Sequence, residues 1–236
     1  MMRGDRSLKV VAMTGRQCAV QIAAIGDDAI KAAAAPHHST FNAAGADWET
    51  DSDEEVQRFY GPGVYHIRVD VADTVAWGYS PAAAQDFYVE VDAYHADGPL
   101  DNEFGILFRE DGENYYIFDV SSDGYFRLHK WLDGEWLSVI DWAESSAIVT
   151  GEGSHNRLAV LAEGPDISLL VNDVVLATVT DDTITGEGLA LTVGTFDEAG
   201  VEIAFDDFLL WPAAGEPLVV VTPDVTPNVT PDVTPE

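Results

Sequence analysis

The sequence has one cysteine, few basic residues and no long apolar run. Cys18 cannot form a disulfide bond within the chain, so cysteine usage assigns no redox compartment. Lysine and arginine number 11 against 42 aspartate and glutamate residues, and such an excess of negative charge repels phosphate backbones and anionic lipid surfaces. No stretch approaches the roughly 20 apolar residues that a membrane-spanning helix needs. The composition therefore argues against nucleic-acid binding and against membrane insertion.

The motifs of several enzyme classes are also missing. The sequence contains no glycine-rich phosphate loop, no CxxC pair and no HExxH motif. His37 and His38 are adjacent, but no third ligand for a zinc ion lies near them in the sequence. A nucleotide-dependent enzyme and a zinc enzyme are therefore not supported.

The acidic composition has three interpretations that the sequence does not separate, namely solubility, adaptation to high salt and cation binding. Acid-rich segments at 97–103, 181–182 and 197–198 offer the oxygen ligands that Ca²⁺ prefers. None of these segments has a recognised ligand spacing. Calcium is therefore a candidate cofactor to which no metal ligands are assigned.

The two ends of the chain differ from its middle. In residues 1–40, the apolar stretch that an export signal requires is split at residues 14–17, and we predict a leader or a poorly ordered arm. In residues 212–236, Thr-Pro recurs every four residues, and prolines at this spacing block helix formation and strand pairing. We predict a linker or stalk there, leading to neighbouring modules, in a protein located at the cell surface or outside the cell.

Residues 41–211 are predicted to form one folded domain. Apolar and polar residues alternate with a period of two, and turn residues such as Asp-Gly separate the strand-like runs. No amphipathic helix lies between these runs, which excludes a parallel α/β sheet and favours an all-β sandwich or barrel. The predicted strands are 64–71, 74–79, 87–95, 102–110, 114–121, 125–132, 135–142, 155–163, 166–172, 174–180, 187–196 and 201–211.

Alternation separates an apolar face from a polar and aromatic face in each strand, because residues i and i+2 point to the same side. In strand 102–110, for example, Phe104, Ile106 and Phe108 are assigned to the core. If the strands are neighbours, one sheet surface collects the opposite set. Its members are Tyr88, Glu90, Asp92, Tyr94, Arg109, Tyr115, Asp119, Tyr125, Arg127, His129 and Trp131.

This mixture of aromatic and charged residues suits a carbohydrate. A sugar ring stacks its C–H face on an aromatic ring, while its hydroxyl groups need carboxylate or guanidinium partners. We predict a glycan or surface ligand on this face, with Trp131 as the leading stacking residue. The alternative is that the same residues only form cross-strand pairs that stabilise a solvated sheet. Three further tryptophans are assigned to the core or to edge cover, namely Trp77, Trp136 and Trp142.

Two segments carry a resemblance to a known superfamily. Residues 102–142, NEFGILFREDGENYYIFDVSSDGYFRLHKWLDGEWLSVIDW, resemble the central hairpins of concanavalin A-like jelly rolls, especially laminin G-like and 3-keto-disaccharide hydrolase-like domains. The closing VEIAFDDFLLW at 201–211 is similar to their last strand. The resemblance implies an antiparallel two-sheet β-sandwich with a bias toward glycans, and also a calcium ion at the sandwich rim. It does not imply a particular reaction, because the superfamily includes lectins, adhesion modules and glycosidases.

The resemblance also allows a test for an enzyme. Retaining β-glucanases of this fold resemble one another in an E-x-D-x-E strand whose outer glutamates act as nucleophile and acid. This sequence keeps Glu90 and Asp92 but has Tyr94 at the third position, so the double displacement lacks one carboxylate. Three hypotheses follow. The first is a noncatalytic extracellular carbohydrate-binding or surface-recognition module, the second a hydrolase of the 3-keto-disaccharide type using Glu90 and Asp92, and the third a structural or adhesion spacer.

Overall fold

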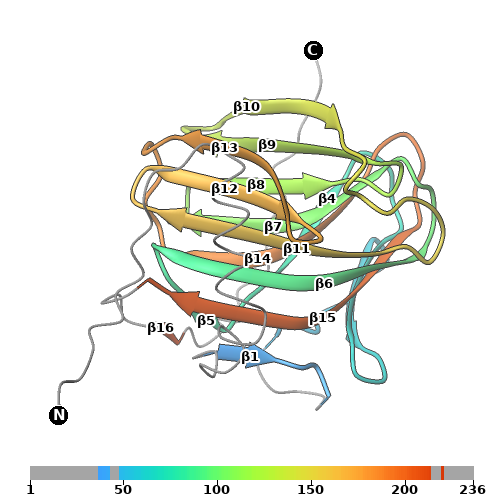
Figure 1. Ribbon diagram of the computed structural model, residues 1–236. Helices are drawn as coiled ribbons and strands as arrows, with labels where there is room; N and C mark the ends of the chain where they lie inside the picture. Colours follow the sequence, from blue (N-terminus) through green and yellow to red (C-terminus); the bar gives the residue numbers. More distant parts are fainter. Residues whose placement is uncertain (1–36, 43–47, 214–218, 221–236) are drawn as a thin grey trace, which may run out of the picture.

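The computed structural model describes residues 37–42, 48–213 and 219–220, and all regular secondary structure in this part is β-strand (Figure 1). Two antiparallel sheets make up the fold, and their inner faces pack against each other. The predicted all-β, two-sheet sandwich is therefore confirmed. Within the described ranges, no helix is long and apolar enough to cross a membrane.

The larger sheet contains eight strands, namely β1 (His37–Ser39), β2 (Val56–Tyr60), β3 (Tyr65–Val69), β6 (Phe87–Asp97), β11 (His155–Glu163), β12 (Asp166–Val171), β13 (Val174–Thr180) and β15 (Val201–Pro212). Their order is β13-β12-β11-β6-β15-β3-β2. The twelve-residue β15 pairs with β3 along its first half and with β1 along its second half.

The smaller sheet contains six strands, namely β4 (Val75–Tyr79), β7 (Asn102–Glu110), β8 (Tyr115–Val120), β9 (Tyr125–Leu132), β10 (Glu135–Glu144) and β14 (Gly188–Thr195). Their order is β10-β9-β8-β7-β14-β4. Two short strands, β5 (Ala82–Ala83) and β16 (Val219–Val220), pair with each other. Every predicted strand range corresponds to an observed strand, whereas β1, β2, β5 and β16 were not predicted.

The two predicted end segments each contribute a short paired strand. His37–Ser39 of the predicted arm pair with Phe208–Leu210 of β15, and Val219–Val220 of the predicted tail pair with β5. The valines of β16 precede the regular proline repeat, so the linker or stalk predicted for that repeat stays a prediction. Residues 1–36, 214–218 and 221–236 lie outside the described residues.

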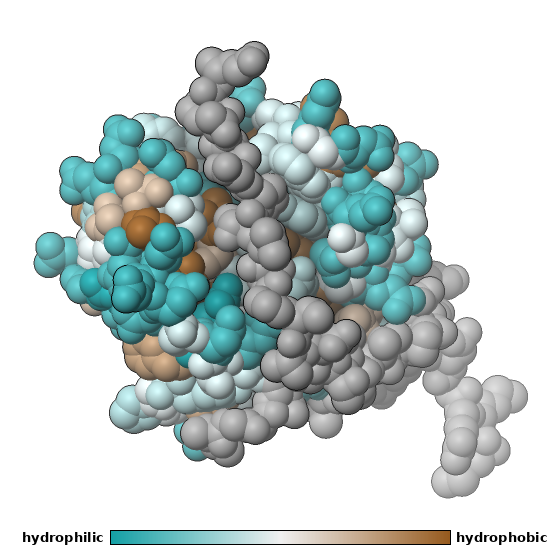
Figure 2. Space-filling view, turned by 180° about the vertical axis from the view of Figure 1, so that it is seen from behind, coloured by the Kyte–Doolittle hydropathy of each residue, from teal (hydrophilic) through white to brown (hydrophobic). Residues whose placement is uncertain are grey.

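The core lies between the two sheets and is built from the apolar sets that alternation predicts. Phe104, Ile106 and Phe108 of β7 are buried, and they pack in one cluster with Val89 and Val91 of β6. Each fully buried side chain of this size contributes about 1.5–3 kcal/mol to folding. Figure 2 shows the molecule from behind, where hydrophilic residues dominate the described surface and hydrophobic residues appear only in separate areas.

A tight turn positions the residues at the edge of the smaller sheet. Asp133 and Gly134 join β9 to β10 with φ angles of 54° and 85°, as a two-residue hairpin turn requires. The turn sets the register, so Trp131 on β9 lies directly opposite Trp136 on β10. Both indole rings therefore lie on the same face of the sheet, the face that points away from the core.

Candidate functional site on the outer face of the six-stranded sheet

The structure contradicts the prediction that the candidate residues share one sheet surface. Tyr88, Glu90, Asp92 and Tyr94 lie on β6 in the eight-stranded sheet. The others that project outward lie on β8 and β9 in the six-stranded sheet, namely Tyr115, Asp119, Tyr125, Arg127, His129 and Trp131. The outer faces of the two sheets point in opposite directions, so the predicted surface is two separate surfaces. Alternation assigns a face within a strand, but it does not say to which sheet the strand belongs.

Arg109 belongs to neither outer face. It has a φ of 53° at a register shift of β7 against β14, and this bulge turns its side chain inward, where it is 1% exposed. Its Nη2 donates to Asp86 Oδ1 at 3.0 Å and to the Gly164 carbonyl at 2.5 Å. Asp86 precedes β6 and Gly164 follows β11, so Arg109 connects the two sheets. The assignment of Arg109 to a binding face is therefore wrong.

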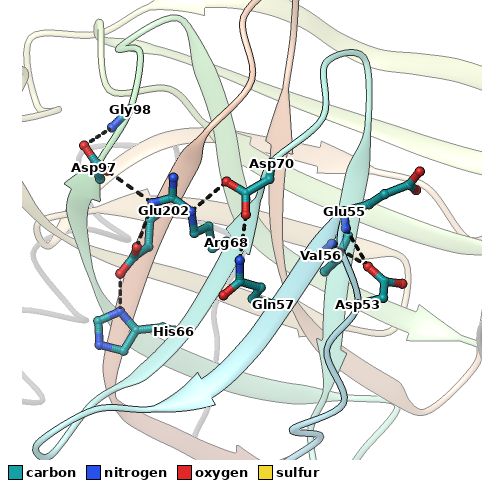
Figure 3. Close-up of polar contacts among 10 residues, drawn as sticks. All are labelled: Asp53, Glu55, Val56, Gln57, His66, Arg68, Asp70, Asp97, Gly98 and Glu202. Carbon is teal, nitrogen blue, oxygen red and sulfur yellow. Dashed lines mark hydrogen bonds and ion pairs between the residues drawn. The ribbon is translucent and has the colours of Figure 1, made fainter.

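The outer face of the eight-stranded sheet carries ion pairs in which the cations are already partnered. Figure 3 shows Arg68 of β3 between three carboxylates: its Nε donates to Asp70 at 2.7 Å, and its Nη1 donates to Asp97 and Glu202 at 3.1 Å each. His66 Nδ1 lies 2.8 Å from the other oxygen of Glu202. This is the arrangement expected of cross-strand pairs that stabilise a solvated sheet.

The candidate residues on β6 are paired in the same way. Arg157 donates to Asp92 at 3.0 Å, the Tyr88 hydroxyl donates to Glu90 at 2.9 Å, and Tyr94 stacks on a histidine of β11. Glu90 and Asp92, the two proposed catalytic carboxylates, therefore both have partners within the sheet.

The outer face of the six-stranded sheet has a buried group of charges at its centre. We call Glu103, Asp119, Arg127 and His129 the carboxylate–arginine centre. Arg127 lies between the two acids, donating from Nε to Asp119 Oδ2 at 3.0 Å and pairing through Nη2 with Glu103. His129 Nε2 lies 2.8 Å from the same oxygen of Asp119. Glu103 was not among the predicted site residues, although its alternation with Gly105 and Leu107 places it on this face.

The two acids of the centre have opposite pKa shifts. Burial, together with the negative charge of Asp119, raises the pKa of Glu103 to about 8 in spite of the nearby Arg127. Burial acts to raise the pKa of Asp119 as well, but the close contacts with His129 and Arg127 outweigh it and lower that pKa below its ordinary value. The centre therefore favours one protonated and one ionised carboxyl group at neutral pH.

Aromatic rings lie beside the carboxylate–arginine centre. Trp136 stacks on His129 with ring centroids 4.6 Å apart and meets the rings of Trp131 and Tyr115 edge to face. We call Tyr115, Trp131 and Trp136 the tryptophan platform. Trp136 is 41% exposed and therefore does not belong to the core, whereas its position on β10, the edge strand of this sheet, agrees with the alternative assignment to edge cover. The exposed position of Trp136 could have been predicted from the Asp-Gly turn at 133–134. A two-residue hairpin turn there places Trp136 directly opposite Trp131.

A shallow pocket adjoins the centre at its other side. Its volume is about 320 Å³. The Arg127 guanidinium lies 4.7 Å above the Trp142 ring, which lines the pocket and therefore links it to the centre. The lining residues are Asp101, Ser121, Asp123, Tyr125, Trp142 and Phe196. The face thus has aromatic rings at two places with charged groups between them.

The predicted calcium site remains a prediction. Across the described part of the chain, no group of three or more His, Cys, Asp or Glu side chains is placed to hold a metal ion. In two of the three acid-rich segments a carboxylate is partnered by a cation, since Asp97 accepts from Arg68 and Asp181 accepts from Lys130 at 2.6 Å. The contacts with Lys130, Thr183 and Tyr116 overcome the effect of burial and hold the pKa of Asp181 well below its ordinary value.

Solved structures that superpose on most of the chain identify its fold. A Bacillus subtilis protein of unknown function with a galectin-like fold superposes with a TM-score of 0.58 at 10% identity, over 75% of this chain and 96% of that one. A β-glucanase of Bacillus licheniformis superposes with a TM-score of 0.55 at 10% identity, over 75% and 97%. The catalytic domain of an endo-1,3-β-glucanase (laminarinase) from Thermotoga petrophila gives 0.53 at 10% identity, over 75% and 96%.

The chain has the concanavalin A-like jelly-roll fold. The resemblance noted in residues 102–142 and 201–211 is therefore confirmed at the level of the fold. No protein-family model and no curated protein sequence matches the chain. The solved jelly rolls that it resembles include two glucanases and a protein of unknown function, so the fold alone assigns no role to the chain.

Proposed function

We propose that the chain is a noncatalytic carbohydrate-binding module that acts outside the cell and holds a glycan on the outer face of the six-stranded sheet. The observation that carries this proposal is the contact between the tryptophan platform and the carboxylate–arginine centre, made where Trp136 stacks on His129. A sugar needs an aromatic ring for its C–H face and adjacent polar groups for its hydroxyls. The extracellular location is supported by the acidic composition and the Thr-Pro tail.

The eight-stranded sheet is a weaker candidate because its aromatic residues accompany charges that already have partners. Phe59 stacks on His66 at 4.6 Å, a geometry close to that of Trp136 on His129, and each histidine also contacts a carboxylate, Glu202 for His66 and Asp119 for His129. The two stacked pairs therefore form a matched set on opposite faces. They differ in the groups around them and not in the stacking itself.

The test is a glycan-array screen of the full chain, followed by calorimetry with any glycan that binds. Trp136→Ala is expected to weaken binding at least tenfold, because a central aromatic anchor typically contributes about 2 kcal/mol or more. Phe59→Ala is the matched control and is expected to leave the affinity unchanged. A glycan that binds Trp136→Ala and Trp131→Ala as tightly as the wild-type chain would contradict the proposed face.

A glycoside hydrolase is the second candidate, and the opposite pKa shifts of Glu103 and Asp119 favour it. Two neighbouring carboxyl groups with separated pKa values can act as acid and base. On this hypothesis the pair replaces Glu90 and Asp92, which lie on the opposite face. Incubating the bound glycans with the chain tests it: product formation that Glu103→Gln abolishes would favour the hydrolase. An empty glycan screen with a protein partner captured instead would favour the structural or adhesion spacer.

A further inference from the structure

On the described part of the outer face of the six-stranded sheet, four buried polar atoms make no well-formed hydrogen bond. One of them, His129 Nε2, lies 2.8 Å from Asp119 Oδ2, and the other three are Trp77 Nε1, Thr192 Oγ1 and Asp119 Oδ1. An unpartnered buried polar atom weakens folding, and native proteins carry few of them. Three such atoms on one face indicate groups whose partner comes from outside the chain.

The three residues lie in one line across the sheet. Trp77 on β4 pairs with Thr192 on β14, Thr192 pairs with Gly105 on β7, and Gly105 pairs with Asp119 on β8. We call Trp77, Thr192, Gly105 and Asp119 the polar row. Neighbouring strands lie roughly 4.8 Å apart, so the row spans about 15 Å.

Gly105 leaves the middle of the polar row without a side chain. A Cβ atom at this position would lie 1.8 Å from the Phe118 carbonyl oxygen on the neighbouring strand, so no other residue fits without a backbone shift. The backbone of β8 therefore takes the place of a side chain at Gly105, and Thr192 and Asp119 on either side of it are each 1% exposed.

The chemistry of the row defines its partner. Trp77 Nε1 only donates a hydrogen bond, Thr192 Oγ1 donates and accepts, and the ionised Asp119 Oδ1 only accepts. Sugar hydroxyl groups satisfy all three because each both donates and accepts. A carboxylate or sulfate on the ligand would be repelled by Asp119, and Arg127, the cation beside it, already lies between two carboxylates.

We infer that the polar row binds the hydroxyl groups of an uncharged oligosaccharide and discriminates against glycans that carry carboxylate or sulfate groups. The inference rests on the proposed function and specifies its ligand. An oligosaccharide is required because the row and the tryptophan platform are both to be occupied. Asp119 of the row and Tyr115 of the platform are four residues apart on β8, a distance of roughly 13 Å along the strand. At the other end of the row, the ring centroids of Trp77 and Tyr115 are 6.1 Å apart.

The experiment is calorimetry on the full chain with neutral hexose oligosaccharides of increasing length and with uronate and sulfated oligosaccharides of the same lengths. Thr192→Val removes one hydroxyl group with little change in shape, and Thr192→Ser is the control that keeps it. We expect Thr192→Val to weaken neutral binding about fivefold to tenfold, and Thr192→Ser to retain it. The melting temperature of Thr192→Val is expected to stay unchanged or rise, because no hydrogen bond within the chain is lost.

The outcomes separate this inference from the proposed function. Uronate or sulfated glycans that bind as tightly as neutral ones would overturn the inference. Unchanged neutral binding by Thr192→Val, with binding lost in Trp136→Ala, would also overturn it while leaving the proposed function standing. Absence of binding to every glycan would overturn both. Neutral binding that grows with chain length and falls in Thr192→Val would support both.

Discussion

The two outer faces of the sandwich carry similar residues but differ in how their polar atoms are partnered. On the eight-stranded sheet, Arg68 and Arg157 donate to carboxylates on neighbouring strands. On the six-stranded sheet, Arg127 is also paired, yet the atoms of the polar row are buried without partners. Among the described residues, the buried unpartnered side-chain atoms on the two outer faces all belong to the six-stranded sheet. Alternating aromatic and charged residues therefore do not distinguish the two faces, whereas the missing hydrogen-bond partners do.

The faces also differ in how far water screens their charges. Around Arg68, the Asp97 side chain is 67% exposed, while the Asp119 side chain beside Arg127 is 1% exposed. Exposed ion pairs contribute little because water and salt screen them, but a buried carboxylate depends strongly on its cation. The following changes test this contrast, from the largest expected effect to the smallest.

Replacing Arg127 is expected to have the largest effect. Arg127→Ala leaves Glu103 and Asp119 buried side by side without their cation, so the free energy of unfolding should fall by about 3–5 kcal/mol. Urea denaturation at pH 8 measures this loss. Adding Glu103→Gln to Arg127→Ala should change the loss little, because without its cation Glu103 is already protonated at pH 8 and only Asp119 is charged. A loss no larger than that of an exposed pair would remove the distinction between the faces.

Neutralising Glu103 should change how stability depends on pH. The pKa of Glu103 is raised from 4.5 to about 8, so the folded chain holds this proton more tightly than the unfolded chain. Stability from this group is full below about pH 4.5 and is lost as the pH rises to about 8. Glu103→Gln should remove that decline, and melting temperatures measured at several pH values between these limits test it.

Asp119 provides a control, because its pKa is shifted in the opposite direction from that of Glu103. Its pKa is lowered, so its stabilising contribution is present at neutral pH and is lost as the pH falls through the acid range. Asp119→Asn is therefore expected to lower the melting temperature at neutral pH, with a smaller difference from the wild-type chain in acid. If both variants shifted stability in the same direction with pH, the assignment of one protonated and one ionised group would be wrong.

Replacing Arg68 should have the smallest effect of the four changes. Arg68→Ala removes contacts with Asp70, Asp97 and Glu202 that are partly exposed, so we expect a loss of about 1 kcal/mol or less. The loss should shrink further in high salt, where exposed charges are screened. Urea denaturation at low and high salt measures both values. A loss comparable to that of Arg127→Ala would show that the two networks are equivalent.

The core and the strands were predictable from the sequence because the pattern that defines them is local. Phe104, Ile106 and Phe108 alternate with a period of two, and each was assigned to the core correctly. The Asp-Gly turns also marked the hairpins from β7 to β10. Short strands such as β1 escaped prediction because three residues give no period.

The candidate site was predictable only in part. Asp119, Arg127, His129 and Trp131 were placed on a common outer face, and the structure brings them together. Arg109 was misplaced because a bulge with positive φ reverses the side to which its side chain points. The residues on β6 were misplaced because the chain crosses from one sheet to the other between β6 and β7.

The sequence by itself determined the all-β character of this protein, its core faces and its acidic surface, since each depends on neighbouring residues or on composition. Tertiary structure alone decided which strands share a sheet and which polar atoms are left without partners. Trp77, Thr192 and Asp119 meet in one row because β4, β14, β7 and β8 are adjacent in space. Their separation along the chain hides this adjacency from any local pattern, because strand pairing is set by packing across the whole domain.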